Sequence, residues 1–489
     1  MKEISNKQKL DELLSRGVGE FIDPDGAFRK KLETAPEKIV IKFGIDPTRP
    51  DIHIGHAVVL RKLRQFQDLG CKVIFLVGDF TALIGDPTGK SKVRPEIEQK
   101  EISLIMETFV RQIPKILKIE PVSEEDKKRA EIGGLTRDSN NFIVESPWFS
   151  WMRNSDWFFN VTDIDPTGAS QQSLVVNDEN GKVLNIKIPK NSFFEKAVVF
   201  ENTRMQKLLK RKEIKTVSFV NFLAYLRLLS HSQLIERDMF QQRINKGEPL
   251  FMHEMMYPVA QGIDSNIISD IYGSCDLEVG GTDQTFNMLM GRTLMKFSKK
   301  EPQAILAFEI LEGLDGKEKM SKSLDNYIGI NEDPNEMFGK IMSIPDNLIT
   351  KYFLLCTDTS KDIIDGYARD MDTGKVNPRD LKMLLGKELV TMYHSKEEAE
   401  KAEENFIATF QKKEIPKDIT EIKADKNDLL VDIFLKNNIV SSKTEFRRLI
   451  DENAITYLDT NEKITEHTVK VSQGVYRIGK KRFCKISLK

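Results

Sequence analysis

The sequence has few cysteines, almost no net charge and no long apolar run, and each shortage narrows the classes of protein that remain. Its four cysteines, Cys71, Cys275, Cys356 and Cys484, lie far apart. This spacing excludes a disulfide framework and a cysteine metal cluster, and it suits a reducing compartment. The 74 Lys and Arg against 75 Asp and Glu leave a net charge of −1. A polyanion would therefore have to bind at local basic patches.

Membrane and secretion signals are also missing. The longest apolar stretches are far shorter than a membrane span. The first residues, MKEISNKQKLDELL, mix acids and bases and lack the apolar core of a signal peptide. No internal repeat or long low-complexity tract is present. We therefore expect a cytoplasmic protein without a membrane partner, and 489 residues predict two or three domains.

The early part of the chain carries the pattern of a parallel sheet. Residues 38–46 form a β-rich run, residues 56–69 have helical periodicity and stop at Gly70, and residues 71–77 are continuously apolar. A continuous apolar run is typical of a strand buried on both faces. Strand, helix and strand in this order predict a βαβ unit, and we predict another between Met255 and Phe308. The expected fold class is α/β.

The string His53-Ile54-Gly55-His56 lies where the first strand gives way to its helix. Ligands of open α/β sheets bind beyond the carboxyl ends of strands, and helix N-termini favour phosphate oxygens. Two imidazoles could donate hydrogen bonds to phosphates, while the glycine would let a nucleotide approach the backbone. The alternative is a pair of histidines that only pack or cap. A metal site is less expected, because no cysteine or further histidine is near in sequence.

Two further loops carry polar chemistry. Residues 81–90, TALIGDPTGK, could form a substrate-binding bend, but the spacing of a Walker loop is absent. Residues 317–323, KEKMSKS, place three lysines and two serines in a loop that could neutralise a pyrophosphate leaving group. By itself, a lysine-rich loop is most often only a solvated surface.

The combination of these strings is more specific than any one of them. FGIDPTRPDIHIGH (43–56), TALIGDPTGKSKVR (81–94), YPVAQGID (257–264), VGGTDQ (279–284) and LDGKEKMSKS (314–323) follow one another in this order. The sequence thereby resembles the class I aminoacyl-tRNA synthetases, whose signatures are HIGH and KMSKS, and in particular the bacterial tyrosyl-tRNA synthetase family. The resemblance implies a Rossmann-like, doubly wound catalytic domain. It also implies activation of L-tyrosine by ATP and transfer of tyrosine to tRNA(Tyr).

The resemblance also implies roles for individual residues. As catalytic residues that stabilise the transition state or meet the pyrophosphate, it implies His53, His56, Lys319, Lys322, Lys90 and Arg94. For the ATP site, it implies Asp46, Thr48, Gly55, Gly281, Asp283 and Lys322, with Asp283 on the ribose. For tyrosine, it implies Asp86, Tyr257, Gln261, Asp264 and Gln284. ATP is the expected cosubstrate with Mg2+ as its counter-ion, and no tightly bound protein metal is expected.

Asp264 is the residue that the resemblance places on the phenol hydroxyl. A buried carboxylate left unpaired by phenylalanine is costly, so such a site rejects the analogue that lacks the hydroxyl; the tyrosyl enzyme is itself a standard example of this effect. Tyr257, Gln261 and Asp264 would share one helix face. Some members of the family have a tyrosine just before the FGIDPT-like segment. Here Lys42 stands at that position, as in a second bacterial branch.

The end of the chain is basic. Residues 426–489 contain 13 Lys or Arg against 8 Asp or Glu. A predicted helix at 441–450 and a β-rich tail at 475–488 would gather cations that bind a phosphate backbone. The segment resembles the RNA-binding module of a ribosomal small-subunit protein and of bacterial tyrosyl-tRNA synthetases. The candidate tRNA-binding residues are Lys443, Arg447, Arg448, Lys480, Lys481 and Arg482. The structural alternative is a basic domain that only packs on its neighbour.

One segment, at about residues 159–214, has no counterpart in the resemblance. Its string SLVVNDENGKVLNIKI predicts a hairpin with a turn near Asn180-Gly181. A basic stretch follows, with Arg204, Lys207, Lys210, Arg211, Lys212 and Lys215. The hairpin and this stretch could extend toward the tRNA acceptor arm or a dimer partner, or they could be a tolerated surface insertion.

The predicted domains are a Rossmann-like catalytic domain at 1–325 with the insertion at 159–214, an α-helical anticodon-side domain at 326–412, a linker at 413–425 and a small α+β RNA-binding domain at 426–489. The family implies a homodimer. The alternative interpretations of the sequence are a tryptophanyl-tRNA synthetase, an RNA-binding or splicing factor descended from a synthetase, and a small-metabolite adenylyltransferase.

Overall fold

The structure is a computed structural model. It describes residues 6–47, 50–86, 99–137, 143–158, 173–177, 183–187, 217, 219–235, 238–410, 419–460, 462–479 and 482–488. The chain forms two compact units. The first comprises residues 1–332 and 343–385, and the second comprises residues 333–342 and 386–489.

A mixed sheet forms the centre of the first unit. Among the described residues it has eight strands in the order β1 (Val18–Ile22), β10 (Ala304–Phe308), β9 (Leu277–Gly281), β2 (Val40–Ile45), β3 (Lys72–Val77), β6 (Phe149–Arg153), β5 (Ile143–Glu145) and β4 (Thr136–Arg137). The neighbours from β10 to β6 are parallel, while β1, β5 and β4 pair antiparallel at the edges. The α/β prediction with a parallel, doubly wound sheet is therefore confirmed, with antiparallel strands added at both edges.

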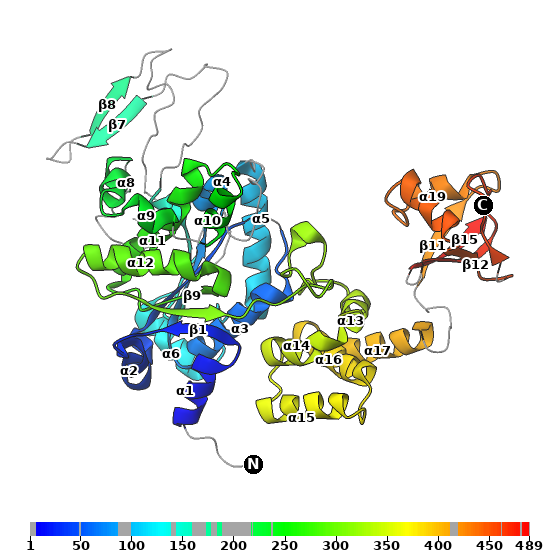
Figure 1. The fold of residues 1–489 in the computed structure, drawn as a ribbon, viewed down its shortest axis with the longest axis horizontal. Helices are drawn as coiled ribbons and strands as arrows, with labels where there is room; N and C mark the ends of the chain where they lie inside the picture. The colour runs from blue at the N-terminus through cyan, green and yellow to red at the C-terminus, as the bar shows by residue number, and fades with distance from the viewer. Residues whose placement is uncertain are drawn as a thin grey trace. The chain divides into compact units, whose positions relative to one another are not determined.

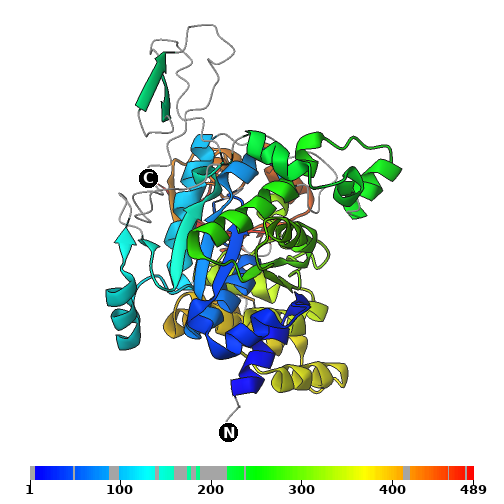
Figure 2. The same ribbon diagram turned by 90° about the vertical axis from the view of Figure 1, so that its left-hand side faces the viewer.

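The strand order creates a switch point beside β2. From β2 the chain proceeds outward to β3 and β6, and it later returns to the other side of β2 as β9 and β10. Figure 2 shows the strands of the first half of the chain, in blue and cyan, running side by side. The side chains of β3 are almost all buried, as its unbroken apolar sequence predicts. Ligands of doubly wound sheets bind beyond the carboxyl ends of strands at such a switch point.

Helices cover both faces of this sheet (Figure 1). The helices of this unit up to β10 are α1 (Asn6–Ser15), α2 (Ala27–Thr34), α3 (Ile54–Asp68), α4 (Asp79–Ile84), α5 (Gln99–Gln112), α6 (Glu124–Gly133), α8 (Phe219–Leu226), α9 (His231–Ile235), α10 (Asp238–Asn245), α11 (Met252–Tyr272) and α12 (Thr285–Phe297). Helices α14 (Ile349–Cys356) and α15 (Lys361–Asp372) belong to the same unit. The predicted first βαβ unit is β2–α3–β3, and the predicted second contains α11 followed by β9–α12–β10.

The predicted hairpin of the 159–214 segment is confirmed by its two strands. β7 (Ser173–Asn177) pairs antiparallel with β8 (Val183–Lys187), and Val175 faces Asn185. The turn between them and the basic stretch from Arg204 to Lys215 lie outside the described residues.

The second unit contains α13 (Pro334–Met342) and α17 (Lys396–Phe410), and its boundary with the first unit falls within α16 (Pro378–Tyr393). Between Pro334 and Phe410 all the elements that the structure describes are helical. The remainder is a sheet in the order β11 (Thr420–Ala424), β15 (Arg482–Leu488), β14 (Gly474–Ile478), β12 (Ile455–Tyr457) and β13 (Glu462–Lys463). Helices α18 (Leu430–Lys436) and α19 (Lys443–Asp451) pack on it around Phe434, Phe446 and Tyr476. None of the described helices is both long and apolar enough to cross a membrane.

Candidate active site

A cavity of about 540 Å³ lies in the first unit, lined from the ends of β2 and β9 and the start of α3. It brings together most of the residues predicted to bind ATP and tyrosine: His53, Gly55, His56, Asp46, Asp86, Tyr257, Gln261, Asp264, Gly281, Asp283, Gln284, Lys319 and Lys322. Thr48, Lys90 and Arg94 lie outside the described residues. The cavity lies at the switch point, where the sheet order predicts a ligand.

The two histidines stack at the N-terminus of α3. Their ring centroids are 3.7 Å apart, and Nδ1 of His53, the N-cap residue, accepts a hydrogen bond from the backbone N–H of His56 at 3.3 Å. Burial, with the charges of Lys322 and Lys319, lowers the pKa of His56 to about 3. Burial and His56 lower the pKa of His53 well below its usual range. Both imidazoles are therefore neutral near pH 7 and offer N–H donors rather than charges.

A short backbone ladder joins the HIGH segment to the chain that follows KMSKS. Ile54 N–H donates to the Ile328 carbonyl, Ile330 N–H donates to the Ile52 carbonyl, and His53 pairs with Gly329 as an isolated bridge. Two segments far apart in sequence are thereby held side by side. This arrangement places the lysines of the second motif beside the histidines of the first.

Asn326 anchors the KMSKS loop. Its Oδ1 accepts from Ser321 N–H at 2.8 Å, and its Nδ2 donates to Asp315 at 2.8 Å and to the Lys319 carbonyl at 3.3 Å. Met320 is buried beside these contacts. The loop is therefore fixed at its backbone, and the side chains of Lys319 and Lys322 line the cavity.

The two cavity lysines have different surroundings. Lys319 Nζ donates to Asp283 at 2.8 Å, so a residue predicted on the phosphates is bonded to one predicted on the ribose. Lys322 Nζ lies 5.5 Å from the centre of the Phe109 ring. Both ammonium groups lie close enough to the histidines to lower their pKa.

Polar groups on the α11 side of the cavity form two hydrogen-bonded sets. Tyr257 Oη donates to Asp46 at 2.9 Å, and Asp46 also accepts from Thr81 at 2.8 Å. Gln284 Nε2 donates to Asp86 at 2.8 Å. Because three strand ends and α11 contribute to these two sets, they fix acceptor oxygens in the cavity wall.

Asp264 is a deeply buried carboxyl group of the cavity lining, with 2% exposure. Trp157 Nε1 donates to its Oδ1 at 2.8 Å, and Asn154 Nδ2 donates to its Oδ2 at 3.4 Å. Burial raises the pKa of Asp264 to about 7, although Lys42 and these two donors act in the opposite direction. The carboxyl group can therefore change its charge near neutral pH.

Comparison with known proteins agrees with this geometry. The family model described as class I tRNA synthetases (W and Y) matches residues 34–164 and 176–411. A tyrosine–tRNA ligase of Francisella tularensis is 36% identical, covering 99% of this chain and 100% of that protein. One of Carboxydothermus hydrogenoformans is 37% identical, covering 97% of each chain. The chain belongs to the class I tRNA synthetase family.

Solved structures agree at the level of the fold. A C-terminally truncated mitochondrial tyrosyl-tRNA synthetase of Aspergillus nidulans aligns with a TM-score of 0.51 and 19% identity, over 82% of this chain and 93% of that one. The tyrosyl-tRNA synthetase of Archaeoglobus fulgidus aligns with a TM-score of 0.50 and 18% identity, over 82% of this chain and 100% of that one. These matches support a Rossmann-like fold.

The sequence motifs did not single out several residues of the cavity. Asn154 lines the cavity and begins the 3₁₀ turn η3 (Asn154–Asp156) that follows β6, and Trp157, directly after this turn, bonds Asp264. Glu278, on β9, bonds both Lys42 and Gln261. A usable signal was present, because Asn154 and Trp157 directly follow a buried parallel strand, where ligand-binding side chains are expected.

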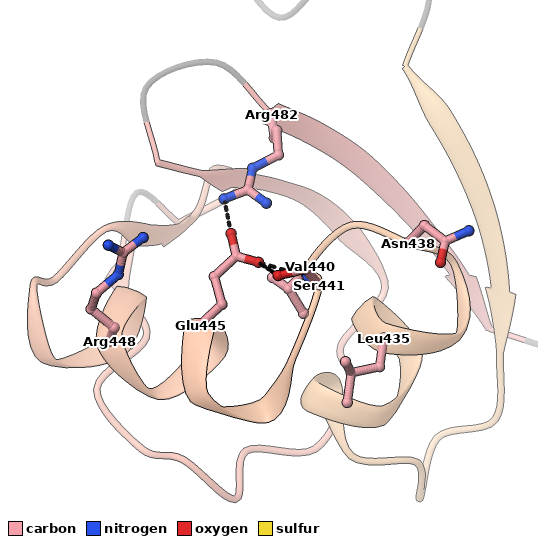
Figure 3. A pocket seen from close by; sticks show the side chains of 7 residues that line it. All are labelled: Leu435, Asn438, Val440, Ser441, Glu445, Arg448 and Arg482. Carbon is pink, nitrogen blue, oxygen red and sulfur yellow. Dashed lines mark hydrogen bonds and ion pairs between the residues drawn. The ribbon is translucent and has the colours of Figure 1, made fainter. Parts of the chain in front are cut away.

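The candidate tRNA-binding residues of the C-terminal module fall into two groups. Lys443, Arg447 and Arg448 are exposed on α19, while Phe446 on the same helix is buried. Arg482 instead donates to Glu445 at 2.9 Å across an open pocket, and the two residues face each other in Figure 3. Lys480 and Lys481 lie outside the described residues.

Proposed function

We propose that this chain activates L-tyrosine with ATP and then transfers the tyrosyl group to tRNA(Tyr). The main support for this proposal is that one cavity is lined by the HIGH histidines, the lysines of KMSKS at 319 and 322, and Asp264. In the first step, a tyrosine carboxylate oxygen attacks the α-phosphorus of ATP. The bond to the bridging oxygen breaks, and pyrophosphate leaves with its electron pair. In the second step, a terminal ribose hydroxyl of the tRNA attacks the tyrosyl carbonyl, and AMP leaves.

The histidines and lysines have complementary roles in the first step. Neutral His53 and His56 donate hydrogen bonds to the phosphate oxygens, and Gly55 leaves room for the nucleotide. Lys319 and Lys322, together with Lys90 and Arg94, neutralise the departing pyrophosphate. Charged donors fixed around a water-poor site stabilise the charge that develops in the transition state.

ATP is placed by Asp46, Thr48, Gly281 and Asp283. Asp283 would accept hydrogen bonds from the ribose hydroxyls. Asp283 accepts a hydrogen bond from Lys319, so a ribose bound to Asp283 would compete for this contact and leave Lys319 to the phosphates. The nucleotide itself therefore helps to assemble the site.

Tyrosine is placed by Tyr257, Gln261, Asp264, Asp86 and Gln284. Tyr257, Gln261 and Asp86 hold its ammonium group, Gln284 lies at its carboxylate end, and Asp264 accepts a hydrogen bond from the phenol hydroxyl. Trp157 and Asn154 keep the Asp264 carboxyl in place, with its oxygens 2.8 and 3.4 Å from their donors. A site built in this way rejects phenylalanine, because the buried carboxylate would be left without a partner.

The proposal extends to the partners and the surroundings of the reaction. ATP enters with Mg2+ as its counter-ion, the enzyme is cytoplasmic, and two copies form a homodimer. We also propose that the catalytic domain ends at residue 325, the helical domain at 412 and the linker at 425. The proposed tRNA contacts are those of Lys443, Arg447, Arg448, Lys480, Lys481 and Arg482. Sedimentation of the purified chain tests the dimer, and a single species with the mass of a monomer would contradict it.

Amino-acid-dependent exchange of pyrophosphate into ATP tests the proposed reaction. All twenty amino acids are assayed separately with the full chain and MgATP. Exchange with tyrosine alone is the expected result, followed by charging of tRNA(Tyr) when the tRNA is added. Exchange with tryptophan alone would assign the other branch of the family, and exchange with no amino acid would leave an RNA-binding role as the better explanation.

A further inference from the structure

A buried ion pair lies in the wall of the tyrosine side of the cavity. Lys42 Nζ is 2.9 Å from Glu278 Oε1, and the two residues are 0% and 1% exposed. Lys42 on β2 is directly opposite Glu278 on β9 in the parallel register, so the sheet itself aligns the two side chains. Both residues line the cavity.

A buried ion pair contributes little net free energy to the stability of a fold. Removing two charges from water costs several kcal/mol, and a well-packed apolar pair of similar volume is often equally stable or more stable. Burial lowers the pKa of Lys42, but Glu278 and Asp264 outweigh that effect and raise it, so the ammonium group stays charged. The stability of the fold alone therefore does not explain why a buried ion pair is present at this position. The contacts of the pair with cavity residues indicate a role in substrate binding.

Glu278 fixes the orientation of Gln261. Gln261 Nε2 donates to Glu278 Oε1 at 3.0 Å, while Gln303 and Ser265 donate to Oε2. A carboxylate only accepts hydrogen bonds, so the Gln261 amide must turn its nitrogen toward Glu278. Its carbonyl oxygen is then the acceptor that it can offer to an ammonium group in the cavity.

Lys42, the other member of the ion pair, also bonds to helix α11. Its ammonium group donates to the Gln261 backbone carbonyl at 2.8 Å and to Ser265 Oγ at 3.0 Å, which fixes the turn of α11 that carries Asp264. The charged groups that face Asp264 are Lys42 on β2 and Glu278 on β9, and its donors are Trp157 and Asn154 at η3. Of these four, only Lys42 brings a positive charge.

We propose that the buried Lys42–Glu278 pair is a positioning element for tyrosine selection. Glu278 holds the Gln261 amide with its oxygen available to the substrate ammonium group, and Lys42 holds Glu278 and the turn of α11 that carries Asp264, which accepts a hydrogen bond from the phenol hydroxyl. Neither residue touches the reacting atoms. The proposal rests on the proposed function, because it assigns this part of the cavity to tyrosine.

The double variant Lys42→Met with Glu278→Met separates selection from folding. It removes the two charges of the pair together, so neither Lys42 nor Glu278 is left as a buried ion without the other. We expect an unfolding temperature close to that of the unchanged chain, a KM for ATP within about twofold, and a KM for tyrosine raised at least about tenfold, with weaker discrimination against phenylalanine. Pyrophosphate exchange at varied tyrosine, phenylalanine and ATP gives all of these quantities.

The single variant Lys42→Met supplies a readout that a purely structural role would not move. Asp264 is active as a carboxylate, so its activity is lost as the pH falls through its pKa. Without the ammonium group that pKa rises, and the loss begins at higher pH. The midpoint of the pH profile of kcat/KM for tyrosine should move upward by about one unit, while the profile for ATP keeps its midpoint.

Glu145→Gln is the matched control for Glu278→Gln. Glu145 pairs with Lys72 in the same sheet but does not line the cavity. Glu278→Gln should raise KM for tyrosine at least about tenfold, and Glu145→Gln should leave it unchanged. Equal effects of the two substitutions, or an unchanged KM for tyrosine and an unmoved midpoint in folded Lys42 and Glu278 variants, would overturn the proposal. Absence of tyrosine-dependent exchange in the unchanged chain would instead overturn the function itself.

Discussion

Ionisable side chains around the cavity are held in different charge states by their surroundings. The two histidines are neutral because they are buried beside lysines, whereas Lys319 keeps a carboxylate partner in Asp283. Asp264 lies between these limits, because burial and its donors oppose each other. The chemistry of the site therefore depends on surroundings that come from several elements.

The titration of Asp264 should give the pH profile of kcat/KM for tyrosine a midpoint near neutral pH. With a pKa of about 7, the carboxylate is mostly present at pH 8 and mostly protonated at pH 6, so kcat/KM for tyrosine should fall about tenfold over this range. His56, with a pKa of about 3, stays neutral throughout and should add no step. Pyrophosphate exchange measured from pH 6 to 8 checks this. Asp264→Asn should flatten the profile, and a profile unchanged by that substitution would contradict it.

Lys322 should act on the rate rather than on tyrosine binding. Its ammonium group lines the cavity near both histidines, where it would meet the charge that develops on pyrophosphate. Lys322→Ala should lower the rate of adenylate formation about a hundredfold with little change in tyrosine affinity. Single-turnover kinetics and equilibrium binding separate the two quantities.

Lys317→Ala is the control in the same loop, because Lys317 is exposed and does not line the cavity. Equal losses of rate and of tyrosine affinity in Lys322→Ala would argue against a transition-state role.

Helix α19 is the element on which the proposed RNA contacts depend most. Ser442 caps its N-terminus by accepting from Glu445 N–H, and Phe446 buries one side of the helix in the core of the module. Arg447 and Arg448 are left on the exposed side. The helix predicted at 441–450 is present as α19, and burial of Phe446 selects the face of this amphipathic helix that turns inward.

Arg447→Ala should weaken tRNA binding without unfolding the module. Loss of one phosphate contact lowers the slope of log affinity against log salt by about 0.7 to 1. Binding titrations at several salt concentrations measure the slope. Lys485→Ala is the control, since Lys485 is paired with Glu421 on the sheet. An equal change of slope in both variants would mean that the module attracts RNA only through its overall charge.

Arg482→Ala should destabilise the C-terminal module, unlike Arg447→Ala. Arg482 donates to Glu445, which also accepts from Ser441, so its loss leaves a partly buried carboxylate with one partner fewer. We expect the C-terminal module to lose about 1–2 kcal/mol of stability, in addition to any loss of RNA affinity. Hydrogen exchange of α19 amides in the full chain reports this, and unchanged protection would place Arg482 among the simple phosphate ligands.

On the scale of the whole molecule, activation and tRNA binding draw on different parts of the chain. The residues that line the active-site cavity fall between Lys42 and Lys322, all in the first compact unit. The C-terminal module has its own core, built from Ile422 to Ile486. Each part therefore buries enough apolar surface to be perturbed separately.

Truncation after Phe410 should separate the two steps. Tyrosine-dependent pyrophosphate exchange should stay within about twofold of the full chain, because the cavity keeps its lining, while charging of tRNA(Tyr) should fall at least about tenfold as phosphate contacts are lost. Both activities are measured on the same preparations. Equal losses of exchange and charging would show that the module supports the fold of the catalytic unit.

The 159–214 segment can be tested at the same scale. If the hairpin and the basic stretch reach RNA or a second copy, deletion of residues 161–212 should weaken tRNA affinity or dimerisation. Binding titrations and sedimentation measure these properties. Unchanged values for both would mark the segment as a tolerated surface insertion.

The sequence by itself determined the local features: the buried parallel strands, the helix after His53, the paired strands of the 173–187 hairpin and the identity of most cavity residues. These follow from short-range patterns of burial and from motifs whose order is specific. Tertiary structure decided which distant groups meet. The contacts of Asp264 with Trp157, of Lys319 with Asp283 and of Lys42 with Glu278 depend on strand order and register. No local pattern encodes them, because each joins residues brought together only when the sheet is complete.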